Sequence, residues 1–210
     1  MSGLVVVGVG PGIGLAVTRR FVREGMSAGL IARSEATVKA AADGLADVLP
    51  VTADVTDEQA LRTALDRIVD AYGVPDVVVY NAALIQADRI GDLTARQHLD
   101  AFAVNVVGAI TTAAHLAPAM AERGSGSFLI TGGMPVPKPD YASLSLDKAG
   151  VRAVVALLHQ QYGAAGVHAA SVTVGGGVSP GSLWDPEDIA DHYWRLHQQA
   201  PAEWIHEVVI

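Results

Sequence analysis

Short runs of β-branched and other apolar residues alternate along the chain with longer, alanine-rich stretches of helical periodicity. Runs that are apolar at nearly every position are typical of strands buried on both faces of a parallel sheet. We predict seven strands, at Leu4–Val7, Ala28–Ala32, Val48–Val51, Val77–Tyr80, Ser127–Thr131, His168–Val174 and Trp204–Ile210. Helices fill the intervals, so the pattern predicts repeated βαβ units in a doubly wound, mainly parallel α/β sheet with helices on both faces.

The length and composition restrict the class of protein. A chain of 210 residues suits a single domain over 1–210, and its formal net charge of −8 opposes binding to nucleic acid or an anionic membrane. It has no cysteine, which excludes disulfides and thiol catalysis, and no uninterrupted apolar run of membrane-spanning length. Because Met1-Ser2-Gly3 leads directly into the first strand, we expect a cytoplasmic protein that acts on small molecules.

A glycine-rich loop follows the first predicted strand. Its glycines are Gly8, Gly10, Gly12 and Gly14, and Ile13 begins the next predicted helix. Backbone N–H groups at a helix N-terminus can face a phosphate, and glycine allows both the tight turn and a close approach of the backbone. The alternative is that the glycines only form a tight turn between strand and helix.

Arg33 follows the second predicted strand, in Ile-Ala-Arg-Ser. An acidic residue here would hydrogen-bond the ribose 2′-hydroxyl of NAD, whereas an arginine accommodates the 2′-phosphate of NADP through charge-assisted hydrogen bonds. Ser34 adds a further donor. NADP(H) is therefore the expected cofactor, and the alternative is a surface arginine without a ligand.

Four further motifs occur downstream in order: Ala53-Asp54-Val55, Asn81-Ala82-Ala83, Asn105 in Phe-Ala-Val-Asn-Val-Val-Gly, and Lys148 followed by Ala-Gly-Val. With the Gly-x-x-x-Gly-x-Gly loop, they resemble the short-chain dehydrogenase/reductase family from Val5 to the last residues. The resemblance implies a Rossmann-like fold and contacts of Asp54 and Val55 with an adenine ring. It also implies that the dinucleotide lies against the segment Asn81, Ala82 and Ala83, although close packing of strand and helix explains the two alanines as well.

In that family a tyrosine transfers the proton, a lysine lowers the pKa of the tyrosine, a serine positions the substrate oxygen and an asparagine completes a water relay. Lys148 and Asn105 match the lysine and the asparagine, but Leu144 occupies the tyrosine position. Leucine neither donates nor accepts a proton, so the standard mechanism through residue 144 is excluded. In the alternatives, Lys148 only binds the nicotinamide ribose, or is a solvated helix residue.

The serine position is also changed. The family's usual spacing back from residue 144 gives Thr131, and Gly132 and Gly133 then occupy what is often Ser-Ser. The Thr131 hydroxyl either remains in the site or points into the sheet, as β-branched strand residues often do.

Tyr141 is a candidate for a relocated proton donor. It precedes Leu144 by three residues and Lys148 by seven, so all three lie along one face of the predicted helix. About 10 Å of helix rise separates it from Lys148, too far for the lysine to lower its pKa by direct contact. Pro139-Asp140 is typical of a helix start, so the alternative is a first-turn tyrosine that shapes the pocket rim.

The segment after the sixth strand is short. Asp185-Pro186 already begins a helix, so almost nothing remains for the substrate lid that the family usually has, and an open site, a large substrate or closure by another subunit is expected. Trp184, Trp194 and Trp204 cluster near the C-terminus, where they serve either subunit contacts or core packing. The resemblance implies a homodimer or homotetramer. We expect no metal site, because no carboxylate pattern completes one with the nearby histidines.

The sequence thus favours an NADP(H)-dependent oxidoreductase of the carbonyl reductase or alcohol dehydrogenase type, with an atypical proton donor and Asn105, Thr131, Tyr141 and Lys148 as its candidate catalytic residues. Two alternatives stay open. One is a non-redox enzyme, such as an isomerase, cyclase or lyase, that uses the same cleft. The other is a non-catalytic protein that binds NADP(H).

Overall fold

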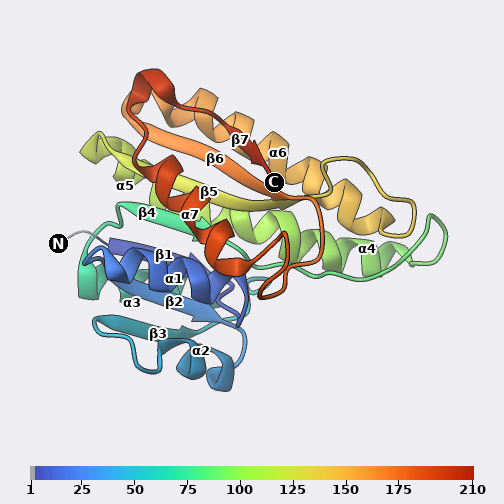
Figure 1. Cartoon of the computed structure of the whole chain (residues 1–210), viewed down its shortest axis with the longest axis horizontal. Helices are drawn as coiled ribbons and strands as arrows, with labels where there is room; N and C mark the ends of the chain where they lie inside the picture. Colours follow the sequence, from blue (N-terminus) through green and yellow to red (C-terminus); the bar gives the residue numbers. More distant parts are fainter. Residues whose placement is uncertain (1–2) are drawn as a thin grey trace.

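The computed structural model describes residues 3–210 as one seven-stranded sheet flanked by helices (Figure 1). All neighbouring strands are parallel, in the order β3-β2-β1-β4-β5-β6-β7. The strands are β1 (Gly3–Val7), β2 (Ser27–Ala32), β3 (Val48–Thr52), β4 (Val77–Tyr80), β5 (Gly126–Gly133), β6 (Val167–Val174) and β7 (Glu207–Val209). The predicted fold class and all seven strands are confirmed. Met1 and Ser2, part of the expectation about the N-terminus, lie outside the described residues.

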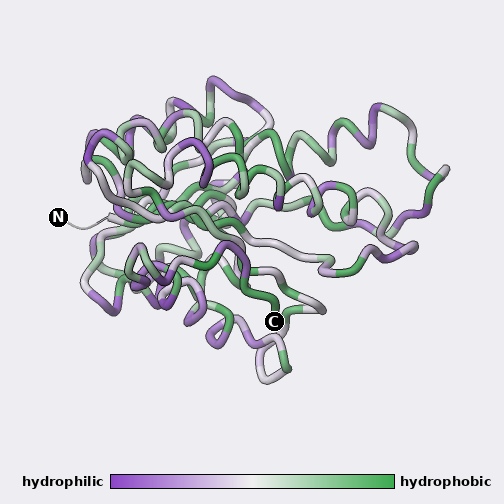
Figure 2. Tube along the Cα trace, turned by 90° about the horizontal axis from the view of Figure 1, so that it is seen from above, coloured by the Kyte–Doolittle hydropathy of each residue, from purple (hydrophilic) through white to green (hydrophobic). Residues whose placement is uncertain are grey.

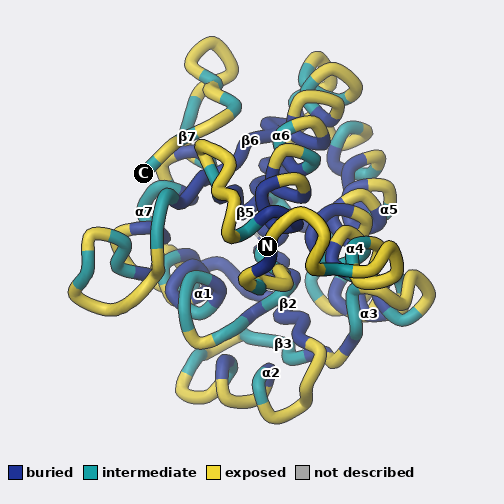
Figure 3. Tube along the Cα trace, turned by 90° about the vertical axis from the view of Figure 1, so that its right-hand side faces the viewer, coloured by how far each residue is buried: buried dark blue, intermediate teal, exposed yellow. Residues whose placement is uncertain are grey.

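The helices form two layers, one on each face of the sheet. The elements are α1 (Ile13–Arg23), α2 (Glu35–Ala42), α3 (Glu58–Tyr72), α4 (Ala95–Phe102), the π-helical turn η1 (Ala103–Val107), α5 (Gly108–Arg123), α6 (Ala142–Tyr162), the 3₁₀ turn η2 (Gly163–Ala165), α7 (Pro186–His197) and the 3₁₀ turn η3 (Pro201–Glu203). One apolar cluster joins the sheet to α3, α5 and α6, and a second joins the other face to α1, α2 and α7. The hydrophobic positions therefore gather in the middle of the molecule (Figure 2), and the exposed segments lie mainly in the outer loops and on the outer helix faces (Figure 3).

The last strand is shorter than predicted. Only Glu207–Val209 pairs with β6, whereas the prediction began the strand at Trp204. Pro201 starts a 3₁₀ turn, and the Trp204 ring then stacks on the buried ring of His168, with centroids 4.8 Å apart. Backbone pairing with β6 therefore begins only at His206, whose O accepts from Ser171 N at 2.9 Å.

The start of α6 also differs from the prediction. Tyr141 is the N-cap residue, outside the first turn, and it makes no side-chain cap hydrogen bond. The Asp140 side chain does not cap the helix, because its Oδ1 accepts from Arg89 Nε at 2.7 Å. The buried carboxylate of Asp88 caps the helix instead, accepting from Ser143 N at 3.0 Å and from Ser143 Oγ at 2.7 Å.

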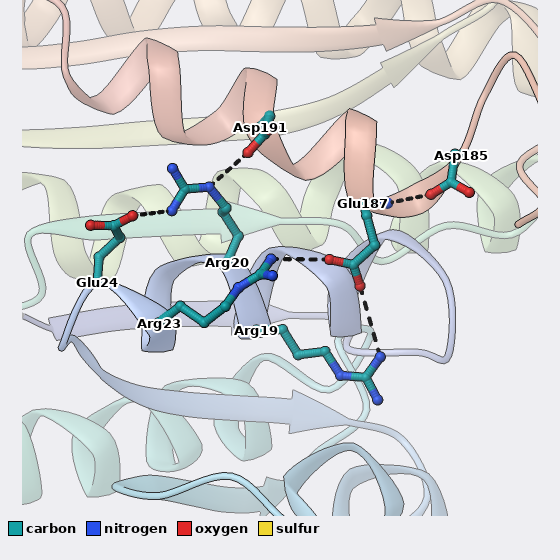
Figure 4. Close-up of polar contacts among 7 residues, drawn as sticks. All are labelled: Arg19, Arg20, Arg23, Glu24, Asp185, Glu187 and Asp191. Carbon is teal, nitrogen blue, oxygen red and sulfur yellow. Dashed lines mark hydrogen bonds and ion pairs between the residues drawn. The ribbon is translucent and has the colours of Figure 1, made fainter. Parts of the chain in front are cut away.

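Helices α1 and α7 pack side by side through a charged seam (Figure 4). Arg20 pairs with Glu24 and with Asp191, its Nε donating to Asp191 Oδ1 at 2.7 Å, and it also lies over the ring of Trp194. Glu187 accepts from Arg23 at 3.1 Å. This seam fixes the helix that carries Tyr193, a residue of the site described below.

One helical stretch, Ala95–Arg123, is long and apolar enough to cross a membrane by composition alone. It comprises α4, η1 and α5, and half of its most apolar window is buried inside the fold. Residues such as Ala109, Leu116 and Met120 pack into the apolar cluster on the sheet. Its composition is therefore explained by its place as a core helix.

Candidate functional site

A cleft of about 780 Å³ opens at the carboxyl ends of the strands. It is lined by residues that directly follow β1 to β6, and its centre lies where the chain reverses its direction of winding, between β1 and β4. Open α/β sheets bind their ligands at this point. The loops after β4 and β5 extend beyond the sheet at one end of the molecule (Figure 1).

The glycine loop forms the floor of the cleft. Gly8 has a left-handed φ of 89°, and a Cβ there would lie 2.2 Å from the backbone nitrogen of Ala82, so only glycine fits. Helix α1 begins with Gly12 as its N-cap, without a side-chain cap and without an acidic residue in its first turn. Around Gly10, a Cβ would meet no atom within 4 Å. The first amides of α1 are therefore free of competing carboxylates and suited to a phosphate.

Three polar residues lie at the β2 end of the cleft. Arg33 is exposed and, within the described chain, has no salt-bridge partner. Ser34 caps α2, its Oγ accepting from Thr37 N at 3.1 Å, and this brings the Thr37 hydroxyl to 2.9 Å from Ser34 Oγ. A cation beside two hydroxyls is a donor set that suits a phosphate dianion. Thr37 was not predicted from the sequence, because only the turn into α2 brings it to the cleft.

Asp54 and Val55 line the same half of the cleft, as predicted for the adenine end. Asp54 Oδ1 accepts from Thr56 N at 2.9 Å and from Thr56 Oγ1 at 2.7 Å. These hydrogen bonds, with a smaller contribution from Arg33, lower the pKa of Asp54. The carboxylate is therefore ionised and fixed in position at neutral pH.

Asn81 links three strands below the cleft. Its Nδ2 donates to Gly8 O at 2.8 Å, and its Oδ1 accepts from Thr131 Oγ1 at 2.8 Å. Thr131 Oγ1 also lies 2.7 Å from the hydroxyl of Tyr193, which is fully buried on α7. Thr131 lines the cleft, but its hydroxyl is engaged by Asn81 and Tyr193, so it supports the cleft floor.

Asn105 lies in the π-helical turn and is buried. Its Oδ1 accepts from Leu84 N at 2.8 Å, and its Nδ2 donates to Leu84 O at 3.2 Å and to Asp147 Oδ2 at 2.7 Å. Burial raises the pKa of Asp147, which the hydrogen bond from Asn105 only partly offsets. Asn105 therefore fixes the strand-to-loop turn after β4 against α6.

Lys148 is buried, with 6% exposure, and its Nζ donates to Thr131 O at 2.7 Å. Burial lowers the pKa of Lys148 to about 8, with Arg152 adding to this effect and Asp147 opposing it. Leu144, one turn earlier on α6, lines the cleft and is only 4% exposed. The end of the cleft near Lys148, called the reaction end below, thus contains an ammonium group beside an apolar side chain. The family that the sequence resembles has the phenol of a tyrosine in place of this apolar side chain.

Tyr141 and Lys138 complete this end of the cleft. Lys138 Nζ donates to Gly175 O at 3.2 Å, which bridges the loop after β5 to the loop after β6. Tyr141, Leu144 and Lys148 were predicted to lie along one helix face, and all three line the same cleft. Lys138 and the Gly175–Val178 wall were missed, because no sequence motif marks them.

The loop between β6 and α7 covers residues 175–185, and the predicted helix start at Asp185 is confirmed. Trp184 packs over Gly176, where a Cβ would lie 2.2 Å from its ring, and its Nε1 donates to Ile210 O at 3.1 Å. Trp194 packs edge-on against Phe21. The three tryptophans thus have partners inside the chain. Within residues 3–210, no three histidine, aspartate or glutamate side chains are grouped as a metal site requires.

The cleft therefore unites the predicted phosphate loop, Arg33, Ser34, Asp54, Val55, the Asn81 segment and Lys148. Gly10 and Gly14 belong to the loop but do not line the cleft, and Asn105 supports it from beneath. These residues fit a dinucleotide: a helix N-terminus with free amides, an unpaired arginine at one end and a buried lysine at the other.

Comparisons with known proteins agree with this arrangement. The family described as short chain dehydrogenase matches residues 3–182. The "Probable oxidoreductase EphD" of Mycobacterium tuberculosis is 36% identical over 131 residues, which cover 60% of this chain but 22% of that protein. This chain thus corresponds to about a fifth of the length of that relative.

Two solved structures share the whole fold. An alcohol dehydrogenase from Thermococcus sibiricus, complexed with 5-hydroxy-NADP, is 22% identical with a TM-score of 0.88, over 100% of this chain and 96% of its own. A 3-oxoacyl-[acyl-carrier protein] reductase from Brucella melitensis, with bound NAD, is 21% identical with a TM-score of 0.89, over 100% of this chain and 89% of its own. The match over residues 3–182, with the fold and the cleft, shows that this chain belongs to the short chain dehydrogenase family of oxidoreductases.

Proposed function

We propose that this protein is an NADP(H)-dependent oxidoreductase of the carbonyl reductase or alcohol dehydrogenase type with an atypical proton donor. The observation that carries the proposal is one continuous cleft that runs from the N-terminus of α1 to Lys148. The α1 amides would hold the pyrophosphate, Asp54 and Val55 the adenine end, and Lys148 the nicotinamide ribose. The bound nicotinamide supplies or accepts a hydride at a carbonyl or alcohol carbon.

The preference for NADP(H) over NAD(H) rests on Arg33, Ser34 and Thr37. One solved relative holds an NADP analogue and another holds NAD, so the cofactor choice follows from this chain's own residues. A guanidinium beside two hydroxyls would bind a 2′-phosphate through charge-assisted hydrogen bonds, whereas a ribose 2′-hydroxyl offers the guanidinium no charged partner.

Proton transfer is assigned to residues other than 144. Three ionisable groups line the reaction end of the cleft, the Tyr141 phenol and the ammonium groups of Lys148 and Lys138, and the Lys138 ammonium is held by Gly175 O. Lys148 has a pKa of about 8, so it is mainly protonated at neutral pH and can release a proton to a developing alkoxide. Tyr141 is the alternative donor from the rim.

The test is NADPH consumption over a panel of aldehydes and ketones. Lys148→Met is expected to lower kcat/KM by at least tenfold, because a positioned general acid typically contributes on the order of 10²-fold or more. Tyr141→Phe separates the two donors: an unchanged rate assigns the proton to Lys148, and a loss of rate assigns it to Tyr141. Lys39→Met, on exposed α2, is the matched control. Absence of consumption across the panel, with NADPH bound, would reject hydride transfer.

A second candidate is supported by Leu144 and Gly133. The tyrosine of the resembling family is absent, Gly132 and Gly133 stand where that family often has two serines, and Leu144 places a buried apolar group in the cleft. A non-redox enzyme, or a protein that binds NADP(H) without turnover, fits this loss. Conversion of a substrate without any redox change, unaffected by removal of NADP(H), would establish the non-redox enzyme.

We also propose a cytoplasmic homodimer or homotetramer. Apolar side chains are exposed along the adjoining helices α4, η1, α5 and α6, among them Leu99, Phe102, Ile110, Leu146 and Leu157. A second copy of the chain that presents the same helices would bury them.

A further inference from the structure

Lys148 is an amine on a ligand cleft without a fixed anionic partner. Its side chain lines the cleft, and its Nζ has one hydrogen bond, to Thr131 O at 2.7 Å. No carboxylate within residues 3–210 forms a salt bridge with it. Lys39, by contrast, pairs with Glu35 at 2.6 Å on the exposed face of α2.

The stem of Lys148 lies next to Gly133, which has no side chain. A Cβ built on Gly133 would lie 3.7 Å from both Cε and Cγ of Lys148, an ordinary contact distance. Leu144 provides an apolar neighbour one turn away on the same helix face. Because Lys148 lines the cleft, a small carbonyl compound that binds there lies beside the lysine side chain.

The surroundings favour the neutral, nucleophilic amine. Burial, with a smaller contribution from the Arg152 guanidinium, lowers the pKa of Lys148 from 10.5 to about 8 against the opposing effect of Asp147. A lysine that is desolvated or next to another cation is the type of lysine that forms Schiff bases. At a pH of about 7.5, this shift raises the neutral fraction on the order of a hundredfold over an exposed lysine.

We propose that Lys148 is a covalent site, at which its amine forms a Schiff base with an aldehyde or ketone bound in the cleft. The neutral amine attacks the carbonyl carbon and forms a C–N bond. The carbonyl oxygen leaves as water, taking both amine protons, and a C=N bond remains between the ligand and Lys148. No oxidant, reductant or nucleotide is required, so this reaction goes beyond the proposed hydride transfer.

The ligand class follows from the walls of the cleft. Leu84, Ile85, Val104 and Leu144 give that region an apolar lining, so an aliphatic carbonyl compound fits better than a sugar. Lys148 cannot form a Schiff base and donate a hydrogen bond to a nicotinamide ribose at the same time. The covalent reaction therefore belongs to the nucleotide-free protein.

The test is reductive trapping with hexanal and cyanoborohydride, without nucleotide, followed by peptide mass mapping. The chain has three lysines, Lys39, Lys138 and Lys148, so each adduct is assigned without ambiguity. We expect Lys148 to be modified faster than Lys39 at a pH of about 7.5, with a labelling midpoint of Lys148 near pH 8.

Two variants test whether Lys148 is labelled because its amine is nucleophilic or only because reagent reaches it. Asp147→Asn removes the carboxylate that raises the pKa of Lys148, so it is expected to move the labelling midpoint of Lys148 to lower pH and to leave that of Lys39 unchanged. Lys148→Met abolishes the adduct at that position, with the fold checked by circular dichroism. An absence of adduct at Lys148, or the same pH dependence at Lys148 and Lys39, would overturn the proposal. Either outcome is independent of cofactor binding.

Discussion

At the scale of single residues, the pair Leu144 and Lys148 defines the chemistry. The sequence alone excludes residue 144 as a proton donor, since the argument needs only the side-chain type. The environment of Lys148 could not be predicted, because it depends on Thr131 O, Gly133 and Arg152, which come from other elements. The direction of the Thr131 hydroxyl was open for the same reason: its partner Tyr193 lies 62 residues away.

Restoring the missing side chains tests whether the remainder of the site is functional. The double variant Leu144→Tyr with Gly133→Ser is expected to consume NADPH at least tenfold faster than the natural chain with a simple ketone, since a positioned general acid contributes on the order of 10²-fold or more. The matched control replaces Leu144→Tyr by Leu144→Phe, which adds the ring without the hydroxyl. Equal rates in the tyrosine and phenylalanine variants would show that the hydroxyl is not positioned for proton transfer.

The buried ammonium of Lys148 also predicts how stability depends on pH. Its folded-state pKa of about 8 lies below the ordinary 10.5, so folding disfavours the charged form. The penalty is absent above pH 10.5, grows as the pH falls toward 8, and is fully present below that value. Lys148→Met is therefore expected to gain roughly 2 kcal/mol of unfolding free energy, relative to the natural chain, between pH 10 and pH 7. Urea titrations measure this difference, and a constant offset at both pH values would contradict it.

At the scale of elements, the apolar runs were sufficient to predict the strands β1, β2, β4, β5 and β6, because nearly every residue in those runs is buried. The pattern gave the wrong boundary where contacts with a residue far away in the sequence set the end of an element. The end of the chain forms only the short β7, since Trp204 stacks on His168 instead of extending the strand. The start of α6 was expected from Pro139-Asp140, but the carboxylate that caps the helix is that of Asp88, which lies in another loop.

The two aspartates near α6 provide a matched comparison. Asp88→Ala is expected to destabilise the protein by about 1–3 kcal/mol, because it removes a buried cap and leaves the Ser143 N–H and hydroxyl without an acceptor. Asp140→Ala removes only an exposed pair with Arg89, at a cost of about 0–1 kcal/mol. Chemical denaturation of both variants measures the difference. A larger effect of Asp140 than of Asp88 would contradict the assigned cap.

At the scale of the whole molecule, the exposed apolar side chains of α4 to α6 predict self-association. Leu146 is 63% exposed and lies on the outer face of α6, away from the cleft. Leu146→Glu is expected to weaken the dimer by about tenfold or more, because it places a charge in an apolar interface. Sedimentation equilibrium measures the constant, with Lys39→Glu on α2 as the control. A natural chain that remains monomeric at high micromolar concentration would reject the interface.

The central claim is that the whole cleft still selects NADP(H). Fluorescence titration of the purified protein with NADPH and with NADH, repeated with Arg33→Ala, tests it most directly. The account predicts micromolar binding of NADPH, weaker binding of NADH, and loss of this preference in the variant, because Arg33 is the residue proposed to bind the 2′-phosphate, which NADH lacks. Absence of binding by either nucleotide, or an unchanged preference after Arg33→Ala, would contradict the claim.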